Sequence, residues 1–543
     1  MDGRFGRRTL LGGAVGALAA AAAAPALAKG GAGGGTGRTP APGFWNRPSK
    51  LNRSDRVFLH RGLVHGAWVR SGPEDGWYPE ATLWNGAGFT TPQFYAEHLA
   101  ESAMGRLEYS EDVMRGLHQP TWALARAPYG QQNLIDLPDP EEDWMTPAMR
   151  ENARDLLSVC FGDEEDFSPA LRDYLAGAMS KIHEELPWVL THTNQALGQY
   201  PDPDMSDYLA TAEPDLLTWD WYPWMQGNST ASSVTGHYRQ LARYRRHALA
   251  GHDGSGASPL AFGQYTIGFR MSSDNGIRQQ RRVYISESQQ NLLPYLTWAA
   301  GGKWLSLFRW ELDEDYYNAE KDILWESDGL FLTDAEENPL PAYHRYQRIN
   351  RDMATFSPYL VRLRSRSAGL LRGALQDGTP SPAVAGLPDW SPALDAAAGI
   401  VGLEATNIGT ANGGHPGDVY VGTFGELPEM SAGENRGVLA DRDEASAFML
   451  VNGMAVYNDE ATDPYAAGGS GEETRQRVTV AVDPRAVRAG TRPRSLSLHT
   501  LDRSTGRPRP VPLETVGDQL QFTVDLDGGA GEQIGRASCR ERV

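Results

Sequence analysis

Acidic side chains follow three apolar segments of this 543-residue sequence, and each stands beside aromatic or further acidic residues. The three acids are Glu164, Asp220 and Glu311. Cleavage of a glycosidic bond needs one protonated carboxyl that donates to the leaving oxygen and one carboxylate that attacks or activates water. Glu164 is the predicted general acid, because the neighbouring carboxylates of Asp163 and Glu165 favour a protonated carboxyl among them.

Asp220 is the first candidate for the second carboxylate, and Glu311 is the second candidate. Asp220 stands in the run Thr-Trp-Asp-Trp-Tyr-Pro-Trp, where four aromatic rings surround one acid. Sugar rings pack their C–H faces on aromatic faces, so this combination is typical of a saccharide subsite. Because neighbours on a strand point to opposite faces, Trp219 or Trp221 must turn away from such a site.

The acidic run Asp163–Asp166 also has a simpler interpretation. It can be a solvated loop that leads to the N-terminus of the next helix, where negative charge is favourable. Its position at the end of a predicted strand favours the functional interpretation. Glu287 also follows a predicted strand, but the segment Ser286–Ser288 is predicted to cap the helix after it.

Polar and aromatic residues at the other strand ends are predicted to complete a substrate site. They are Asp163, His60, His65, Gln93, Arg126, His192, Asn194, Trp221, Tyr222, Gln264, Tyr265, Arg309 and Trp310. A metal site built from His60, His65 and His192 with Asp220 is an alternative, because the ligand types fit. The sequence has no H-E-x-x-H or similarly tight spacing, so we expect neither a metal nor a cofactor.

Short apolar strands alternate with amphipathic helices eight times between about Arg56 and Arg362. The predicted strands are Val57–Trp68, Gly88–Tyr95, Pro120–Arg126, 156–165, Trp188–Asn194, 217–224, Pro259–Tyr265 and Trp304–Glu311. Continuous apolar strands are typical of a parallel sheet covered by helices. Eight such units predict an α/β fold, a (β/α)₈ TIM barrel at 51–365, with its chemistry at the C-terminal strand ends.

The pattern changes at 366–532, where Gly, Pro and Ser increase. Short runs that alternate at period two, such as Ala447–Asn452, Arg477–Val482 and Leu520–Val524, predict an antiparallel β-sandwich domain.

Both ends of the chain are set apart from this fold. A paired arginine, an apolar stretch and an Ala-Leu-Ala site predict a twin-arginine signal peptide at 1–28, and a flexible leader at 29–50. We therefore expect secretion to an extracytoplasmic location and no membrane contact after cleavage. Residues 533–543 match the translation of a common sequencing-adapter sequence, so we expect them to be an artefact and the sandwich to lack its natural end.

The formal net charge is −19 at pH 7, and it becomes more negative without the two end segments. A protein this acidic is repelled by nucleic acid and anionic lipid, so neither is an expected partner. Of the two cysteines, Cys160 lies in an apolar strand and is predicted to be a small buried hydrophobe. The sequence has no heptad repeat, so it predicts no coiled-coil oligomer and leaves the oligomeric state open.

Residues 55–365 resemble the secreted (β/α)₈ glycoside hydrolase-like proteins. The ending Gly-Asp163-Glu164-Glu165 is similar to the Asp-Glu-Pro ending of strand four in many of them, and Ala299-Ala300-Gly-Gly-Lys-Trp is similar to their approach to strand eight. The resemblance implies hydrolysis of O-glycosidic bonds in a poly- or oligosaccharide, with the strand-four glutamate as acid.

The sequence departs from the best-known retaining members, which carry Asn-Glu on strand four and a nucleophilic Glu on strand seven. Here strand four ends Asp163-Glu164 and strand seven ends Phe-Gly-Gln264-Tyr265. That leaves open inversion through one of the other two acids. It also leaves open a saccharide-binding barrel without catalysis, and a metal-assisted hydrolase.

Overall fold

The computed structural model of the chain describes residues 45, 48–69, 81–94, 115–118, 156–196, 198–223, 231–268, 271–272, 282–310, 316–318, 323–325, 332–333, 337–394, 398–439, 446–456, 470–483 and 497–536. No helix within these ranges is long and apolar enough to cross a membrane.

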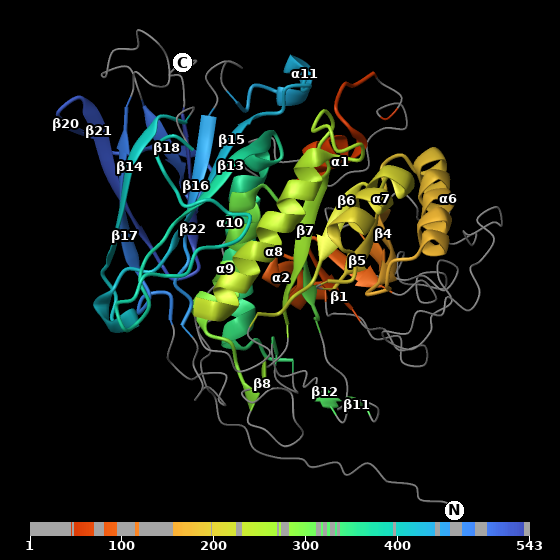
Figure 1. Cartoon of the computed structure of the whole chain (residues 1–543), viewed down its shortest axis with the longest axis horizontal. Coiled ribbons are helices and arrows are strands. Elements are labelled where there is room, and N and C mark those ends of the chain that lie inside the picture. Colours follow the sequence, from red (N-terminus) through yellow and green to blue (C-terminus); the bar gives the residue numbers. More distant parts are fainter. Residues whose placement is uncertain are drawn as a thin grey trace, which may run out of the picture.

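Parallel strands close into an eight-stranded barrel within the described ranges (Figure 1). The strands are β1 (Val64–Trp68), β2 (Thr91–Phe94), β3 (Arg115–His118), β4 (Leu156–Asp163), β5 (Leu190–Gln195), β6 (Leu216–Trp219), β7 (Ala261–Ile267) and β10 (Trp304–Phe308). Their order is β1-β10-β7-β6-β5-β4-β3-β2, and β1 pairs with both β2 and β10. The predicted (β/α)₈ barrel is confirmed.

Helices alternate with these strands as the apolar periodicity predicts. They are α1 (Arg53–Arg61), α2 (Ala81–Ala87), α6 (Pro169–Glu185), α7 (Asp202–Ala212), α8 (Ala231–Ala250), α9 (Glu287–Ala300) and α10 (Pro341–Leu360). The Ser168 hydroxyl accepts a hydrogen bond from the Leu171 amide at 3.1 Å and begins α6. Ser286 and Gln289 form a capping box at the start of α9, so the predicted cap at Ser286 is confirmed.

Two predicted strands have different bounds in the structure. The first half of the predicted strand Val57–Trp68 belongs to helix α1, where the Asn52 side chain caps the first turn. The third strand is Arg115–His118, before the predicted segment Pro120–Arg126. The first error arises because short apolar runs do not distinguish a buried helix from a buried strand. The predicted third segment lies outside the described residues.

Antiparallel strands form a sandwich of two sheets after the barrel, as the sequence predicts. One sheet has the order β13-β15-β16-β22-β18-β19 and the other β14-β17-β21-β20. The strands are β13 (Leu363–Leu371), β14 (Ile400–Asn407), β15 (Val419–Glu426), β16 (Ser446–Asn452), β17 (Gln476–Val482), β18 (Leu498–Leu501), β19 (Pro508–Pro510), β20 (Glu514–Val516), β21 (Gln519–Leu526) and β22 (Gly531–Arg536). Valine, leucine, isoleucine and phenylalanine side chains from both sheets pack into a separate core between them.

Strand β22 runs through 533–536, the first four residues of the segment for which we expect an adapter origin. It pairs with β16 and β18, and the Ile534 side chain is 1% exposed in the sandwich core. The origin of these residues stays a prediction.

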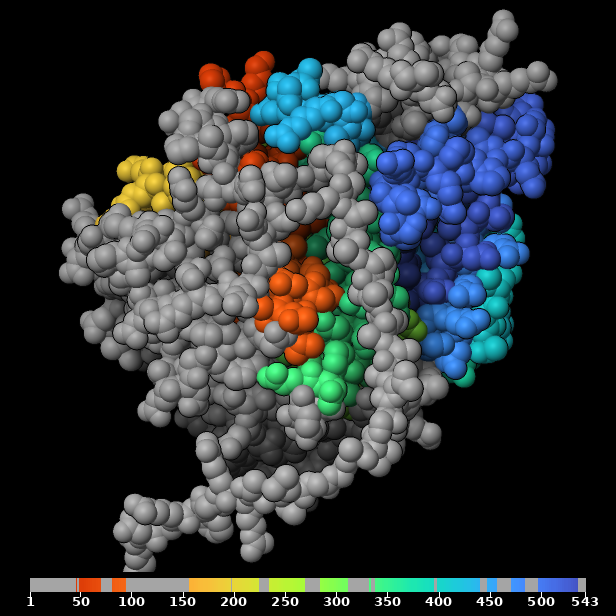
Figure 2. Space-filling model, turned by 180° about the vertical axis from the view of Figure 1, so that it is seen from behind, coloured from red at the N-terminus to blue at the C-terminus, as the bar shows by residue number. Residues whose placement is uncertain are grey.

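The sandwich packs against the barrel through helices α8, α9 and α10, which lie between the two in Figure 1. Helix α9 contacts β15 so closely that a Cβ on Gly422 would lie 1.7 Å from the Ala299 carbonyl oxygen. Seen from behind in Figure 2, the blue and cyan surface of the sandwich runs along one side of the molecule. The smaller elements are the hairpins β8 (Met271–Ser272) with β9 (Arg282–Val283) and β11 (Tyr316–Asn318) with β12 (Ile323–Trp325), helix α11 (Ala432–Asn435) and a 3₁₀ turn at Asn412–Gly414.

A chain of ion pairs reinforces this junction at the N-terminal end of the barrel. Lys303 lies 2.7 Å from Asp55 of α1, and Arg364 of β13 lies 3.3 Å from the same carboxylate and 3.0 Å from Glu429. The pairs therefore connect α1, the start of β10 and the first sandwich strand.

Candidate active site

Three carboxyl groups meet at the C-terminal end of the barrel, carried by β4 and β6. Asp163 is the last residue of β4, Glu164 follows it, and Asp220 follows β6. Strand β5 lies between them and fixes both backbones: the Glu164 amide donates to the Asn194 carbonyl at 3.0 Å, and the Asp220 amide donates to the Gln195 carbonyl at 3.1 Å. The ladder hydrogen bonds thus continue one residue beyond each strand.

The three carboxyl side chains are linked to one another and to Asn194. The Asn194 amide donates to Asp163 Oδ1 at 2.8 Å. The Asp220 carboxyl lies close enough to the Glu164 and Asn194 side chains for both to affect its pKa. Glu164 has the left-handed backbone conformation, φ 62°, which turns the chain sharply where β4 ends. Residues predicted from two separate segments therefore form one cluster.

The surroundings of Asp220 favour its protonated form. Burial raises the pKa of this carboxyl well above its usual value, and the nearby charges of Glu164 and Asp163 raise it further. The Glu164 side chain also raises this pKa as a neighbouring polar group, whereas the Asn194 side chain lowers it. Neighbouring carboxyls disfavour ionisation of both at once, so Asp220 beside Glu164 keeps a proton at pH values that ionise an isolated aspartate.

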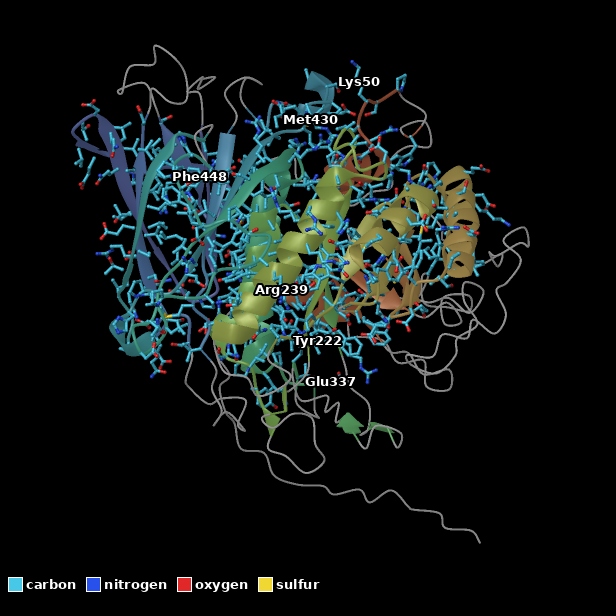
Figure 3. All side chains as sticks on the ribbon, viewed as in Figure 1. Lys50, Tyr222, Arg239, Glu337, Met430 and Phe448 are labelled. Carbon is cyan, nitrogen blue, oxygen red and sulfur yellow. The ribbon has the colours of Figure 1, made fainter. Side chains whose placement is uncertain are left out.

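Aromatic rings lie beside this pair. Burial raises the pKa of the Tyr222 phenol, and the nearby charge of Asp220 raises it further. The Tyr222 ring lies 6.0 Å from that of Phe308, which stacks on Trp68 at 4.5 Å. The Arg309 guanidinium lies 5.8 Å from the Trp68 ring centre. Figure 3 labels Tyr222 at the end of the barrel from which the hairpin β11–β12 extends.

The sequence reasoning did not include Trp68 and Phe308 among the site residues, although each stands at the end of a strand. Each is the last residue of its strand, and apolar residues at these positions look like core. The strand pairing shows that the two residues lie side by side at the end of the barrel, because β1 and β10 are neighbours there although the sequence separates them by more than 200 residues.

Four more predicted residues lie on the inner side of the barrel or at its end. The Ser306 hydroxyl donates to Gln93 Oε1 at 3.1 Å, and Tyr265 packs edge-on against Trp304 at 5.3 Å. The other two are Asn194 and Arg309, at the strand ends beside Asp163 and Trp68.

His192 lies deeper in the barrel. Its ring is fully buried 5.4 Å from Trp304, and its Nδ1 is 2.9 Å from the Thr218 hydroxyl. The His192 ring therefore packs the barrel interior and is not at the surface that a ligand would touch.

Three predicted substrate-binding residues have side chains that contact the surrounding helices, and their role in binding stays a prediction. Gln264 donates to the Leu293 carbonyl of α9 at 3.1 Å. Trp221 stacks on His237 of α8, with ring centres 6.0 Å apart. Trp310 lies 5.0 Å from Trp84 of α2 and 5.6 Å from Phe89. Each stands next to an inward-facing residue, and alternation along an extended chain sends neighbours to opposite faces.

The candidate metal histidines are not brought together. His60 is in the last turn of α1, before β1 begins, and its ring meets Trp45 edge-on, so its predicted place at a strand end is wrong. His65 faces the helix layer, with Nδ1 2.5 Å from Asn350 Oδ1 of α10, and burial lowers its pKa to about 3. No group of three potential metal ligands occurs within the described ranges. Arg126 and Glu311 lie outside those ranges.

Cys160 is buried in β4, and its thiol donates to the Gly162 carbonyl at 3.1 Å. Burial raises the pKa of this thiol, and the nearby charge of Asp163 raises it further. The thiolate is therefore disfavoured, as expected of a buried hydrophobe.

The chain is similar in backbone to several solved structures. A β-galactosidase from Bacillus circulans sp. alkalophilus aligns with a TM-score of 0.45 at 9% identity, over 88% of this chain and 99% of that chain. A GH27 β-L-arabinopyranosidase from Geobacillus stearothermophilus aligns with a TM-score of 0.39 at 7% identity, over 91% and 100%. A GH51 arabinofuranosidase from Xanthomonas axonopodis pv. citri gives 0.38 at 9%, over 91% and 98%. No protein-family model matches the chain, and no curated protein sequence matches it.

Proposed function

We propose that this protein is a glycoside hydrolase that cleaves O-glycosidic bonds of a poly- or oligosaccharide. The observation that carries the proposal is a buried Asp220 carboxyl, with Glu164 close to it, at the C-terminal end of a (β/α)₈ barrel. Enzymes with this fold have their active sites at that end. Hydrolysis of a glycosidic bond begins with a carboxyl that is still protonated near neutral pH, and the pair supplies one.

The proton belongs to the pair, with Asp220 as its preferred holder. Asp220 is the member whose burial and neighbouring charges favour the neutral form. The sequence predicts Glu164 as the acid, whereas burial and nearby charges favour a protonated Asp220. Because the two carboxyls are close, we treat them as one proton-donating pair. The pair donates its proton to the leaving glycosidic oxygen, which leaves both carboxyls ionised, with the Asn194 amide as a hydrogen-bond donor beside them.

The second catalytic carboxyl is proposed to be Glu311. The acid and its partner carboxylate are about 5–5.5 Å apart in retaining glycosidases and about 6.5–9.5 Å apart in inverting ones. Asp220 and Glu164 are close neighbours, and we propose them as one proton-donating unit rather than as the two separated carboxyls. Glu311 follows Trp310, and the support for it is its sequence position just beyond β10.

Aromatic rings support a sugar as the ligand. Tyr222 remains partly exposed beside the carboxyl pair, and Phe308 and Trp68 continue from it toward Arg309. Rings of this kind pack against the C–H faces of a sugar, while the guanidinium and Asn194 offer donors to its hydroxyl groups. Export by the twin-arginine pathway is part of the proposal and would bring the enzyme to extracellular glycans.

The test is release of reducing ends from a panel of glycans, with Glu164→Gln as the inactivating variant. Glu165→Gln is the matched control, because it removes one carboxylate charge from the residue next to Glu164 in the same acidic run. We expect Glu164→Gln to lose cleavage and keep saccharide binding, and Glu165→Gln to keep both.

Two other outcomes would replace the proposal. Saccharide binding without cleavage by the natural sequence would identify a binding barrel. Cleavage that stops on treatment with a chelator and returns with a divalent metal would identify a metal-assisted hydrolase. If Glu164→Gln cleaves at the rate of the natural sequence, the carboxyl pair is not the proton donor.

A further inference from the structure

The side of β6 that faces away from the barrel interior carries a column of four stacked rings. Trp221 stacks on His237 with ring centres 6.0 Å apart and planes 21° apart. His237 lies 5.2 Å from Trp219, and Trp219 stacks on Tyr244 at 5.1 Å and 15°. His237 and Tyr244 belong to α8, whereas the two indoles come from the end of β6. The column therefore joins strand and helix through the residues on both sides of Asp220.

His237 contributes to this column as a ring and not as a hydrogen-bonding group. It is fully buried, and neither ring nitrogen has a hydrogen-bond partner within the described ranges. Burial lowers its pKa to about 3, so the imidazole is neutral at any physiological pH. A buried polar group without a partner costs stability. Stability alone would favour an apolar side chain at this position. The contribution of His237 to the structure is therefore the fit of its ring between Trp219 and Trp221.

Gly236 makes room for the outer indole. A Cβ at this position would lie 2.3 Å from Cη2 of Trp221, at the far end of that ring. Any larger residue would push the indole off His237. The absence of a side chain at Gly236 thus lets Trp221 lie flat against α8.

We propose that His237 and Gly236 of α8 are positioning residues that set where the Asp220 carboxyl points, by holding the two tryptophans that flank it. The proposal rests on the proposed function, in which the Asp220–Glu164 pair donates the proton. The Asp220 backbone is held by the hydrogen bond from its amide to Gln195 of β5. With both neighbouring side chains fixed on the outer face, the Asp220 side chain is directed inward to Glu164.

The position of a proton donor affects the rate far more than it affects binding. A displacement of about 1 Å in a reacting group can cost about 10²-fold in rate. Loss of the column should therefore lower kcat and leave KM nearly unchanged. It should also move Asp220 away from Glu164 and Asp163, the charged groups that face it from β4, and so lower the pH at which the pair loses its proton.

The experiment compares His237→Ala, His237→Phe and Gly236→Ala in the full chain. His247→Ala is the matched control, because His247 is also buried on α8 but lies 3.0 Å from Asp202 of α7, away from the ring column. For each variant, kcat and KM are measured, and the pH dependence of the free energy of unfolding is followed with and without Asp220→Asn.

We expect His237→Ala and Gly236→Ala to lower kcat at least about tenfold with KM within about twofold, and to lower the pH midpoint that depends on Asp220. His237→Phe should restore both, because it restores a ring to the column. His247→Ala should reduce stability and leave the midpoint in place. An unchanged midpoint and kcat in His237→Ala would overturn the proposal.

The unfolding measurement separates this proposal from the proposed function. If the natural sequence cleaves no glycan but His237→Ala still moves the midpoint, the positioning role stands and the hydrolase assignment fails. If cleavage depends on Glu164 and the midpoint does not respond to His237→Ala, the hydrolase assignment stands and the positioning role fails.

Discussion

At the N-terminal end of β6 the Asp215 carboxylate lies against Arg53 and His183, whereas at the C-terminal end of the same strand Asp220 lies against Glu164. Burial raises the pKa of both aspartates. At Asp215 the Arg53 charge and the His183 hydrogen bond outweigh burial, and the pKa falls well below its usual value. At Asp220 the neighbouring carboxylates add to burial.

This difference separates a stabilising end of the barrel from the end that we propose to be reactive. Asp215 also accepts hydrogen bonds from the Thr191 amide at 2.9 Å and hydroxyl at 3.0 Å, so its charge is fully compensated. Such a group holds β5, β6 and α1 together. The Asp220 environment destabilises the ionised form, and natural proteins retain such arrangements at functional sites.

The largest expected effect comes from removing the acid at the reactive end. Asp220→Asn should lower kcat by about 10²–10⁴-fold, because the pair loses its transferable proton. The double variant with Glu164→Gln should be no slower than the slower single variant, since groups that act as a unit are not additive. Release of reducing ends by the three variants measures this. Multiplicative losses would mean that the two carboxyls act separately.

The next largest effect is expected at the stabilising end. Asp215→Asn should lower the free energy of unfolding by about 3 kcal/mol, because the Arg53 guanidinium loses its buried counter-charge. Urea unfolding measures the loss. The kcat of the folded fraction should stay within about twofold, since the substitution lies at the opposite end of the strand. A loss of kcat equal to that of Asp220→Asn would contradict the separation of the two ends.

The two aspartates should affect the pH dependence of stability with opposite signs. The lowered pKa of Asp215 gives stability that is present above its unfolded pKa, about 4, and lost as the pH falls. The raised pKa of Asp220 gives stability that is present below about pH 4 and lost as the pH rises toward neutrality. Asp220→Asn should therefore gain about 1 kcal/mol at pH 7, and little at pH 3. Urea unfolding across this range provides the measurement, and equal gains at both pH values would contradict it.

The smallest effect is expected from the aromatic neighbour of the pair. Tyr222→Ala should raise KM about fivefold, because a stacking contact with a sugar contributes about 1 kcal/mol. Tyr222→Phe is the control that keeps the ring, and its KM should stay within about twofold. Steady-state kinetics on the cleaved glycan decide the matter. If Tyr222→Phe matches Tyr222→Ala, the hydroxyl and not the ring contacts the substrate.

The sequence determined the order of the barrel elements. Eight apolar segments, the helix cap at Ser286, and acids just after β4 and β6 are local patterns, and local patterns follow from side-chain period and turn chemistry. It also determined the sandwich, because period-two alternation is visible within each run. The bounds of β1 were wrong, because short apolar runs fit a helix or a strand equally well, and β3 has too little apolar character to be found by this pattern.

Only the tertiary structure decided which side chains meet. Gln264 and Tyr265 are neighbours in sequence, yet one bonds to α9 and the other lines the barrel, because a single residue of register reverses the face. The contact between Asp220 and Glu164 crosses β5 and depends on three strands ending at the same height. The physical reason is that register and strand neighbours are set by long-range pairing, which the sequence around each residue does not contain.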